Sequence, residues 1–199
     1  MRQMVSMPCE FRTREDDDQY IIEGYFAVFD SIYNIAPGMS ESIALGAFQS
    51  SMGQDVRALV NHDTTFVVGR TTAKTLELRE DDHGLYGVIS VNPNDRSAMD
   101  AFERVKRGDV SQCSWGGNIR SEDTDVREDG SVHWTLRDVD LWEVSICTFP
   151  AYEETAISAR AAQVDEIKKR QTQAWREKLM MRLKGEEDGS EGNHAPQKD

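Results

Sequence analysis

Ser114 is a candidate nucleophile because of its setting. It lies in VSQCSWGGNIR (110–120), between a thiol and an indole, and two adjacent glycines, Gly116 and Gly117, follow. Paired glycines weaken a strand interior, which suggests that another group comes close to the backbone there. Free N–H groups at these glycines could stabilise the oxyanion of an acyl-transfer intermediate. A β-bulge between two strands is the competing explanation for the glycines.

His62 is the best-placed candidate base. It stands in LVNHD, directly after the strand-like run VRALV (56–60), which would hold its position. A lone histidine at the end of a strand is also commonly just a surface or hydrogen-bonded residue, so its position leaves catalysis open.

Glu143 is the candidate acid, in LWEVSICTFP (141–150). Strand alternation divides this stretch into two faces, one with Leu141, Glu143 and Ser145, and the other with Trp142, Val144 and Ile146. We expect the second face to be the core. Glu143 is then either solvent-facing or the carboxylate that orients a histidine. A nucleophile, a base and an acid on separate segments would satisfy the logic of a hydrolytic triad, but spacing alone does not bring them together.

Cys113 is an alternative nucleophile. Alternation places Cys113 and Ser114 on opposite faces, and we expect Cys113, beside Trp115, to pack inward. The histidines and cysteines lack the spacing of a zinc site, and the chain contains no P-loop or GxGxxG motif. We therefore expect no metal and no other cofactor.

Composition limits the class of protein. The 199 residues, 38% of them hydrophobic, suffice for one domain and a tail. A net charge of −13 argues against a nucleic-acid partner, because no basic stripe is present to neutralise phosphates. Three widely spaced cysteines favour a reducing compartment, and no apolar run is long enough to span a membrane. We expect a cytosolic protein with no membrane association.

The pattern of elements predicts a mainly β protein with flanking helices, of the α+β class. Strands are expected at 20–29, 56–60, 110–121, 131–137 and 139–148, with a hairpin over 75–91. A helix is expected over 94–107, capped by Asn94 or Asp95 at its start and by Gly108 at its end. The segment 34–43 is turn-rich, and a short helix could begin in 46–53. These strands suggest a closed or nearly closed barrel, or a sandwich.

The two ends differ from the centre. We expect a flexible N-terminus over 1–18, a single domain over 19–160, an amphipathic helix over 161–184 and a disordered acidic tail over 185–199. The helix has an apolar stripe that could dock on its own domain, pair in a dimer or bind a partner. Its members are Val164, Ile167, Trp175, Leu179 and Leu183.

Six stretches, in this order, resemble the prohead (capsid-maturation) serine proteases of tailed bacteriophages, which are distantly similar to herpesvirus assemblins. They are IEGYFAVFD (22–30), LGAFQSSM (45–52), ALVNHDTTFVVGRT (58–71), LELREDDHGLYGVISV (76–91), VKRGDVSQCSWGG (105–117) and LWEVSICTFPAYEETAISAR (141–160). One such motif would be weak, but six in the same order are a specific signal.

The resemblance implies a small assemblin-like β-barrel with flanking helices. It implies Ser114 as nucleophile, His62 as general base and Glu143 as third member, with oxyanion donors near Gly116 and Gly117. Family members often have Met-Ser-Phe-Gly-Phe where this chain has Cys-Ser-Trp-Gly-Gly, which leaves less bulk after the first glycine. Assemblins use a second histidine where this chain offers Glu143.

The resemblance also implies a prohead maturation endopeptidase. It would cut a scaffolding protein or the scaffolding segment of the major capsid protein, and also itself, inside the assembling procapsid in the host cytoplasm. A homodimer or higher homo-oligomer is implied, and the helix and tail would be an assembly element removed by self-cleavage. Two alternatives stay open: a catalytically inactive capsid-assembly protein with the same fold, and a hydrolase that uses Cys113.

Overall fold

The computed structural model describes residues 2–8, 11–16, 19–149 and 154–190. The chain divides into two units, Met1–Ile157 and Ser158–Asp199. The first is mainly β, and helix α2 (Glu154–Ser190) supplies the described part of the second. This helix is longer than the predicted 161–184, and residues 191–199 of the predicted tail lie outside the described residues.

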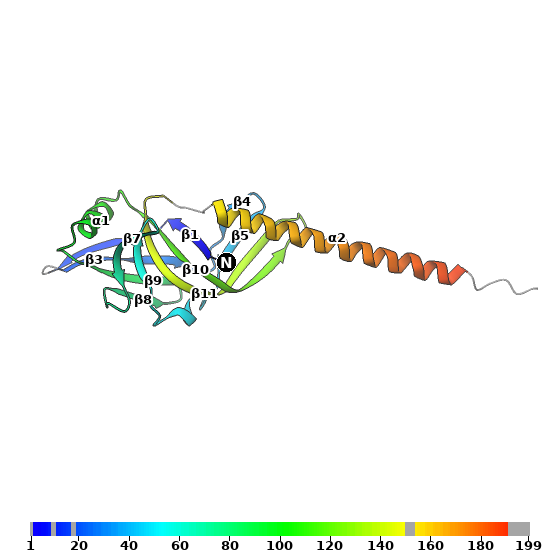
Figure 1. Ribbon diagram of the computed structural model, residues 1–199, viewed down its shortest axis with the longest axis horizontal. Helices are drawn as coiled ribbons and strands as arrows, with labels where there is room; N and C mark the ends of the chain where they lie inside the picture. The colour runs from blue at the N-terminus through cyan, green and yellow to red at the C-terminus, as the bar shows by residue number, and fades with distance from the viewer. Residues whose placement is uncertain (1, 9–10, 17–18, 150–153, 191–199) are drawn as a thin grey trace, which may run out of the picture. The chain divides into compact units, whose positions relative to one another are not determined.

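The first unit contains two sheets (Figure 1). The larger has seven strands, in the order β1 (Arg2–Pro8), β10 (Gln112–Val126), β11 (Val132–Cys147), β5 (Met39–Ile43) and β4 (Tyr33–Ala36), with β6 (Arg57–Val60) pairing both β11 and β7 (Asp63–Arg70). The smaller has four, in the order β2 (Arg12–Asp16), β3 (Gln19–Val28), β9 (Gly84–Val91) and β8 (Leu76–Glu80).

The α+β prediction is confirmed, but the predicted barrel is not. The strand pairings among the described residues form two open sheets and no closed ring. The core is one cluster of apolar side chains contributed by both sheets and by α1 (Arg96–Arg107). Its largest fully buried aromatic members include Phe26, Phe48, Phe102 and Trp115.

The predicted helix over 94–107 is confirmed as α1. The Asp95 side chain accepts hydrogen bonds from the Ser97 and Ala98 amides, and Gly108 ends the helix in the left-handed conformation. Other segments differ from the prediction. The turn-rich segment 34–43 contains parts of β4 and β5, the expected flexible N-terminus contains β1 and β2, and the segment 46–53 holds only a 3-10 helix, Gln49–Ser51.

Strands β10 and β11 form a long antiparallel hairpin (Figure 1). Gly116 pairs with Glu143 while Gly117 pairs with Leu141, so Trp142 is an extra residue in a β-bulge. The bulge switches the alternation. Leu141 is buried in the core and Trp142 is 39% exposed, so the expectation that Trp142 faces the core and Leu141 faces away is wrong. After the bulge, Val144 and Ile146 face the core as predicted.

Replacing the buried tryptophan beside Ser114 should destabilise the fold. Trp115 has no exposed surface and packs edge-on against Phe48. Trp115→Ala should lower the free energy of unfolding by about 3–5 kcal/mol in urea titrations. Trp142→Ala, at the exposed bulge, is the control and should cost less than about 1 kcal/mol. Equal losses would contradict this assignment of the faces of the hairpin.

Candidate active site

His62 lies at the tip of a tight hairpin between β6 and β7. Val60 pairs with Asp63, and the two residues between them, Asn61 and His62, have φ values of 51° and 61°. Positive φ at both central positions is what a type I′ turn requires, and the second position usually holds glycine. Histidine in this conformation costs on the order of 1 kcal/mol, so the imidazole is held here against local preference.

The pairing of β6 with β11 brings this turn to Glu143. The two strands are parallel, with Leu59 opposite Ser145, so the turn after Val60 lies against the C-terminal part of β11. Asn61 reinforces the placement. Its backbone N–H donates to the Ile146 carbonyl, and its side-chain oxygen accepts from the Thr148 backbone N–H at 2.9 Å.

The imidazole of His62 contacts the Glu143 carboxylate directly. Nδ1 lies 2.6 Å from Oε1, and the two side chains are only 9% and 6% exposed. A hydrogen bond this short to a carboxylate fixes the tautomer with the proton on Nδ1 and leaves Nε2 to accept a proton. Nε2 is buried and has no hydrogen-bond partner among the described residues.

Ser145 joins the two partners of this pair. Its hydroxyl donates to the second carboxylate oxygen, Oε2 of Glu143, at 2.6 Å, and accepts from the backbone N–H of His62 at 3.3 Å. Ser145 has no exposed surface.

Ser114 lies on the same face of the hairpin. It is directly opposite Ser145 in the β10–β11 register, and side chains of opposed residues point to the same side with Cβ atoms about 4.5–5.5 Å apart. Ser114 has no exposed surface. The structure therefore brings Ser114, Glu143 and Ser145 to one face of the sheet, where His62 contacts Glu143.

The paired glycines make room for Glu143 and for the bulge. A Cβ on Gly116 would overlap Oε1 of Glu143, and a Cβ on Gly117 would overlap the Asp140 carbonyl and lie 3.2 Å from Cα of Leu141. The sequence offered two explanations for the paired glycines, a group that approaches the backbone and a β-bulge, and the structure contains both. The group that approaches the backbone at Gly116 is the candidate acid itself, and a bulge lies beside Gly117.

Three findings place the chain among known proteins. Residues 8–170 match the family model of the caudovirus prohead serine proteases. The chain belongs to this family. It is 30% identical over 154 residues to the prohead protease of Enterobacteria phage HK97. This match covers 75% of this chain and 64% of that protein. The chain therefore spans slightly less than two thirds of the length of this relative. The structure of the bacteriophage T4 capsid assembly protease shares the fold, with a TM-score of 0.50, 11% identity and coverage of 75% of this chain and 97% of that one.

Cys113 faces away from the site. It is fully buried, and its Sγ donates to the Tyr25 carbonyl at 3.0 Å, in agreement with the prediction that it packs inward. Cys147 is 2% exposed, and burial raises the pKa of its thiol to about 12. Both thiols are thus kept protonated or inaccessible, which disfavours a cysteine nucleophile.

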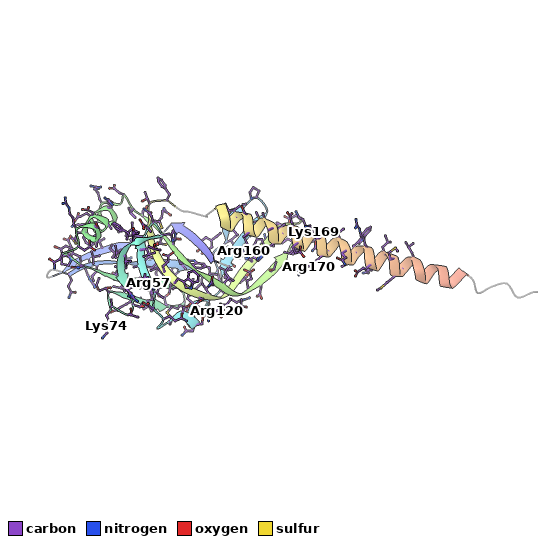
Figure 2. The ribbon with its side chains drawn as sticks, in the orientation of Figure 1. Arg57, Lys74, Arg120, Arg160, Lys169 and Arg170 are labelled. Atoms are coloured by element: carbon purple, nitrogen blue, oxygen red, sulfur yellow. The ribbon has the colours of Figure 1, made fainter. Side chains whose placement is uncertain are left out.

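The other titratable groups near these strands serve local structure. His133 bridges the hydroxyls of Ser40 and Ser42, each at 2.9 Å, and burial lowers its pKa. Arg57, labelled in Figure 2, is opposite Glu143 in the β6–β11 register, and its guanidinium pairs with Asp55 at 3.1 Å.

No group of three or more metal-ligating side chains occurs among the described residues. No helix in the described part of the chain is long and apolar enough to cross a membrane.

Sequence reasoning proposed Ser114, His62 and Glu143 as site residues but gave no role to Ser145. Alternation did place Ser145 on the face of Glu143. Its contact with the His62 backbone joins residues 83 positions apart, and it depends on the parallel pairing of β6 with β11.

A methyl group at position 116 should separate the imidazole from the carboxylate. Gly116→Ala should displace the Glu143 carboxylate, and the downfield NMR signal of the His62 Nδ1 proton should be lost or strongly shifted. Gly87→Ala is the matched control, because its Cβ would lie 2.6 Å from the Phe26 ring. This variant should lose about 1–3 kcal/mol of stability by overpacking yet keep the signal. An unchanged signal in Gly116→Ala would contradict the steric role.

The buried thiols should resist alkylation. Iodoacetamide at pH 8 should leave Cys113 and Cys147 unmodified in the folded protein under conditions that label both in urea, because neither is accessible as a thiolate. Peptide mapping by mass spectrometry separates these two sites from Cys9. Rapid labelling of Cys113 in the folded protein would restore the cysteine-hydrolase alternative.

Proposed function

We propose that this chain is a serine endopeptidase that matures viral proheads. It cuts a scaffolding protein or the scaffolding segment of the major capsid protein, and it cuts itself. Family membership and the similarity to a prohead protease support a protease of this class. The likeness to the T4 protein supports the fold.

One observation carries the proposal: the buried hydrogen bond between His62 Nδ1 and Glu143 Oε1. It gives the imidazole the tautomer that a general base needs, with Nε2 left to receive a proton. The pair lies on the face of the hairpin to which Ser114 belongs. A carboxylate, a histidine and a serine on one face match the roles of a hydrolytic triad.

The reaction uses these three side chains in sequence. His62 Nε2 takes the hydroxyl proton of Ser114 as the Oγ attacks the scissile carbonyl, and the Glu143 carboxylate stabilises the imidazolium. His62 then gives the proton to the leaving amine. The same imidazole then deprotonates a water molecule that attacks the acyl carbon, the bond to Ser114 Oγ breaks, and the imidazolium returns the proton to Ser114.

Gly116 and Gly117 remain the proposed donors to the oxyanion, with a condition. Strand β10 is paired on both sides at these residues, with β1 on one edge and β11 on the other. An N–H group that belongs to a ladder has to leave it before it can bind an oxyanion. Such a donor is worth about 10²–10³ in kcat, so its release would be a large part of activation.

Access to the nucleophile requires a structural change. Ser114 has no exposed surface, and Nε2 of His62 is also buried. A peptide bond reaches Ser114 only after the residues that cover this face move. A protease built in this way is inactive until it is opened, which suits an enzyme that must act only inside an assembling procapsid.

The proposal extends to assembly. The enzyme acts in the procapsid in the host cytoplasm, as a homodimer or higher homo-oligomer, without a cofactor or a nucleic-acid partner. Helix α2 is 37 residues long and exposes Trp175 and Leu179, among other apolar side chains. It and the residues after it form the assembly element that self-cleavage removes.

Removing the nucleophile should abolish both cleavages. On co-expression with the major capsid protein of the same virus, the wild-type chain should cut that protein and lose its own C-terminal region, as read by intact-mass spectrometry. Ser114→Ala should do neither, and Glu143→Gln should be slowed by about 10³-fold or more. Ser111→Ala, an exposed serine three residues earlier, is the matched control and should cleave like the wild type.

Two outcomes would contradict the proposal. If Ser114→Ala still trims itself at the wild-type site, the nucleophile is wrong. If the wild type leaves both the capsid protein and itself intact under conditions that assemble procapsids, the chain is instead an inactive assembly protein with this fold.

A further inference from the structure

We propose that Ser145 is a positioning residue of the active site, whose hydroxyl holds the Glu143 carboxylate and the His62 backbone in one fixed arrangement. The inference rests on the proposed function and deepens it. It assigns a role to a buried side chain that the three-residue mechanism leaves without one.

The Glu143 carboxylate needs contacts to both of its oxygens to have a fixed orientation. The terminal torsion of a glutamate side chain has a broad energy profile, so one hydrogen bond to Oε1 leaves the plane of the carboxylate loosely defined. Ser145 donates to Oε2 at 2.6 Å, the carboxylate oxygen that His62 does not contact. With both oxygens bound, the carboxylate has one orientation toward the imidazole.

Ser145 also contacts the turn that carries the base. His62 has a φ of 61°, in the left-handed region that few residues other than glycine adopt. Its N–H donates to Ser145 Oγ at 3.3 Å. A hydroxyl can donate once and accept at the same time, so one oxygen connects the backbone of the base to the side chain of the acid.

Ser145 differs in its contacts from another buried serine, Ser51. Ser51 is buried, and its hydroxyl donates to the Val139 carbonyl and accepts from the Leu141 backbone N–H. Its two contacts are therefore with backbone groups of one strand, β11. Ser145 instead contacts both members of the His–Glu pair, and it lies opposite Ser114 in the register.

The test measures steady-state cleavage of uncut capsid protein purified from the Ser114→Ala co-expression. Ser145→Ala should lower kcat by about 10- to 100-fold, the value of a hydrogen bond to a charged group, with KM changed less than about twofold. In a Glu143→Gln background, the same substitution should add less than about twofold, because its effect passes through the carboxylate. Ser51→Ala should lose stability but keep the wild-type kcat.

A matched pair keeps the test valid if alanine disturbs the packing. Ser145→Thr and Ser145→Val add nearly the same volume, and only threonine keeps the hydroxyl. Threonine should retain a higher kcat than valine at equal folded fraction, and only threonine should retain the downfield signal of the His62 Nδ1 proton.

The failures of the two proposals are distinguishable. If Glu143→Gln cleaves at the wild-type rate, the role of Glu143 fails, and the role of Ser145 fails with it. If Glu143→Gln is slow but Ser145→Ala lowers kcat by the same factor in both backgrounds, or if threonine and valine behave alike, Ser145 is a structural serine and the triad stands.

Discussion

The buried carboxylate of Glu143 is the constraint from which the local structure follows. A carboxylate that is 6% exposed is stable only when its oxygens are hydrogen-bonded, and here His62 and Ser145 each bind one. Gly116 leaves the space that this carboxylate occupies, and the left-handed turn at His62 presents the imidazole to it. Each of these features is locally unfavourable, and each makes sense once the carboxylate is in place.

Strand β10 serves the core and the site at once. Cys113 and Trp115 pack on one face while Ser114 and Gly116 face the other. Trp115 pairs with Val144 next to the pair of Ser114 with Ser145, so the packing of Trp115 in the core supports the register that sets Ser114 opposite Ser145. Stability and site geometry are therefore coupled through the same hairpin, and the bulge at Trp142 marks where the alternation of β11 changes phase.

Much of the fold could be predicted where the signal is local. The caps of α1 at Asp95 and Gly108 and the inward orientation of Cys113 were evident from the sequence. The strands β4 and β5 were missed because Gly38 and its polar neighbours look like a turn, whereas β5 pairs with the distant strand β11 and β4 pairs with β5. The predicted barrel was not confirmed and the predicted orientation of Trp142 was wrong, because closure and bulges depend on pairing between distant segments.

The sequence by itself determined which residues had the chemistry: a serine before two glycines, a histidine after an apolar strand and a glutamate on the face of β11 away from its core residues Val144 and Ile146. The tertiary structure decided that His62 meets Glu143, that Ser145 joins them and that the glycines accommodate the acid. The physical reason is range. Alternation and capping are set by neighbours a few residues apart, while the site is assembled by the pairing of β6, β10 and β11, whose register only the folded sheet specifies.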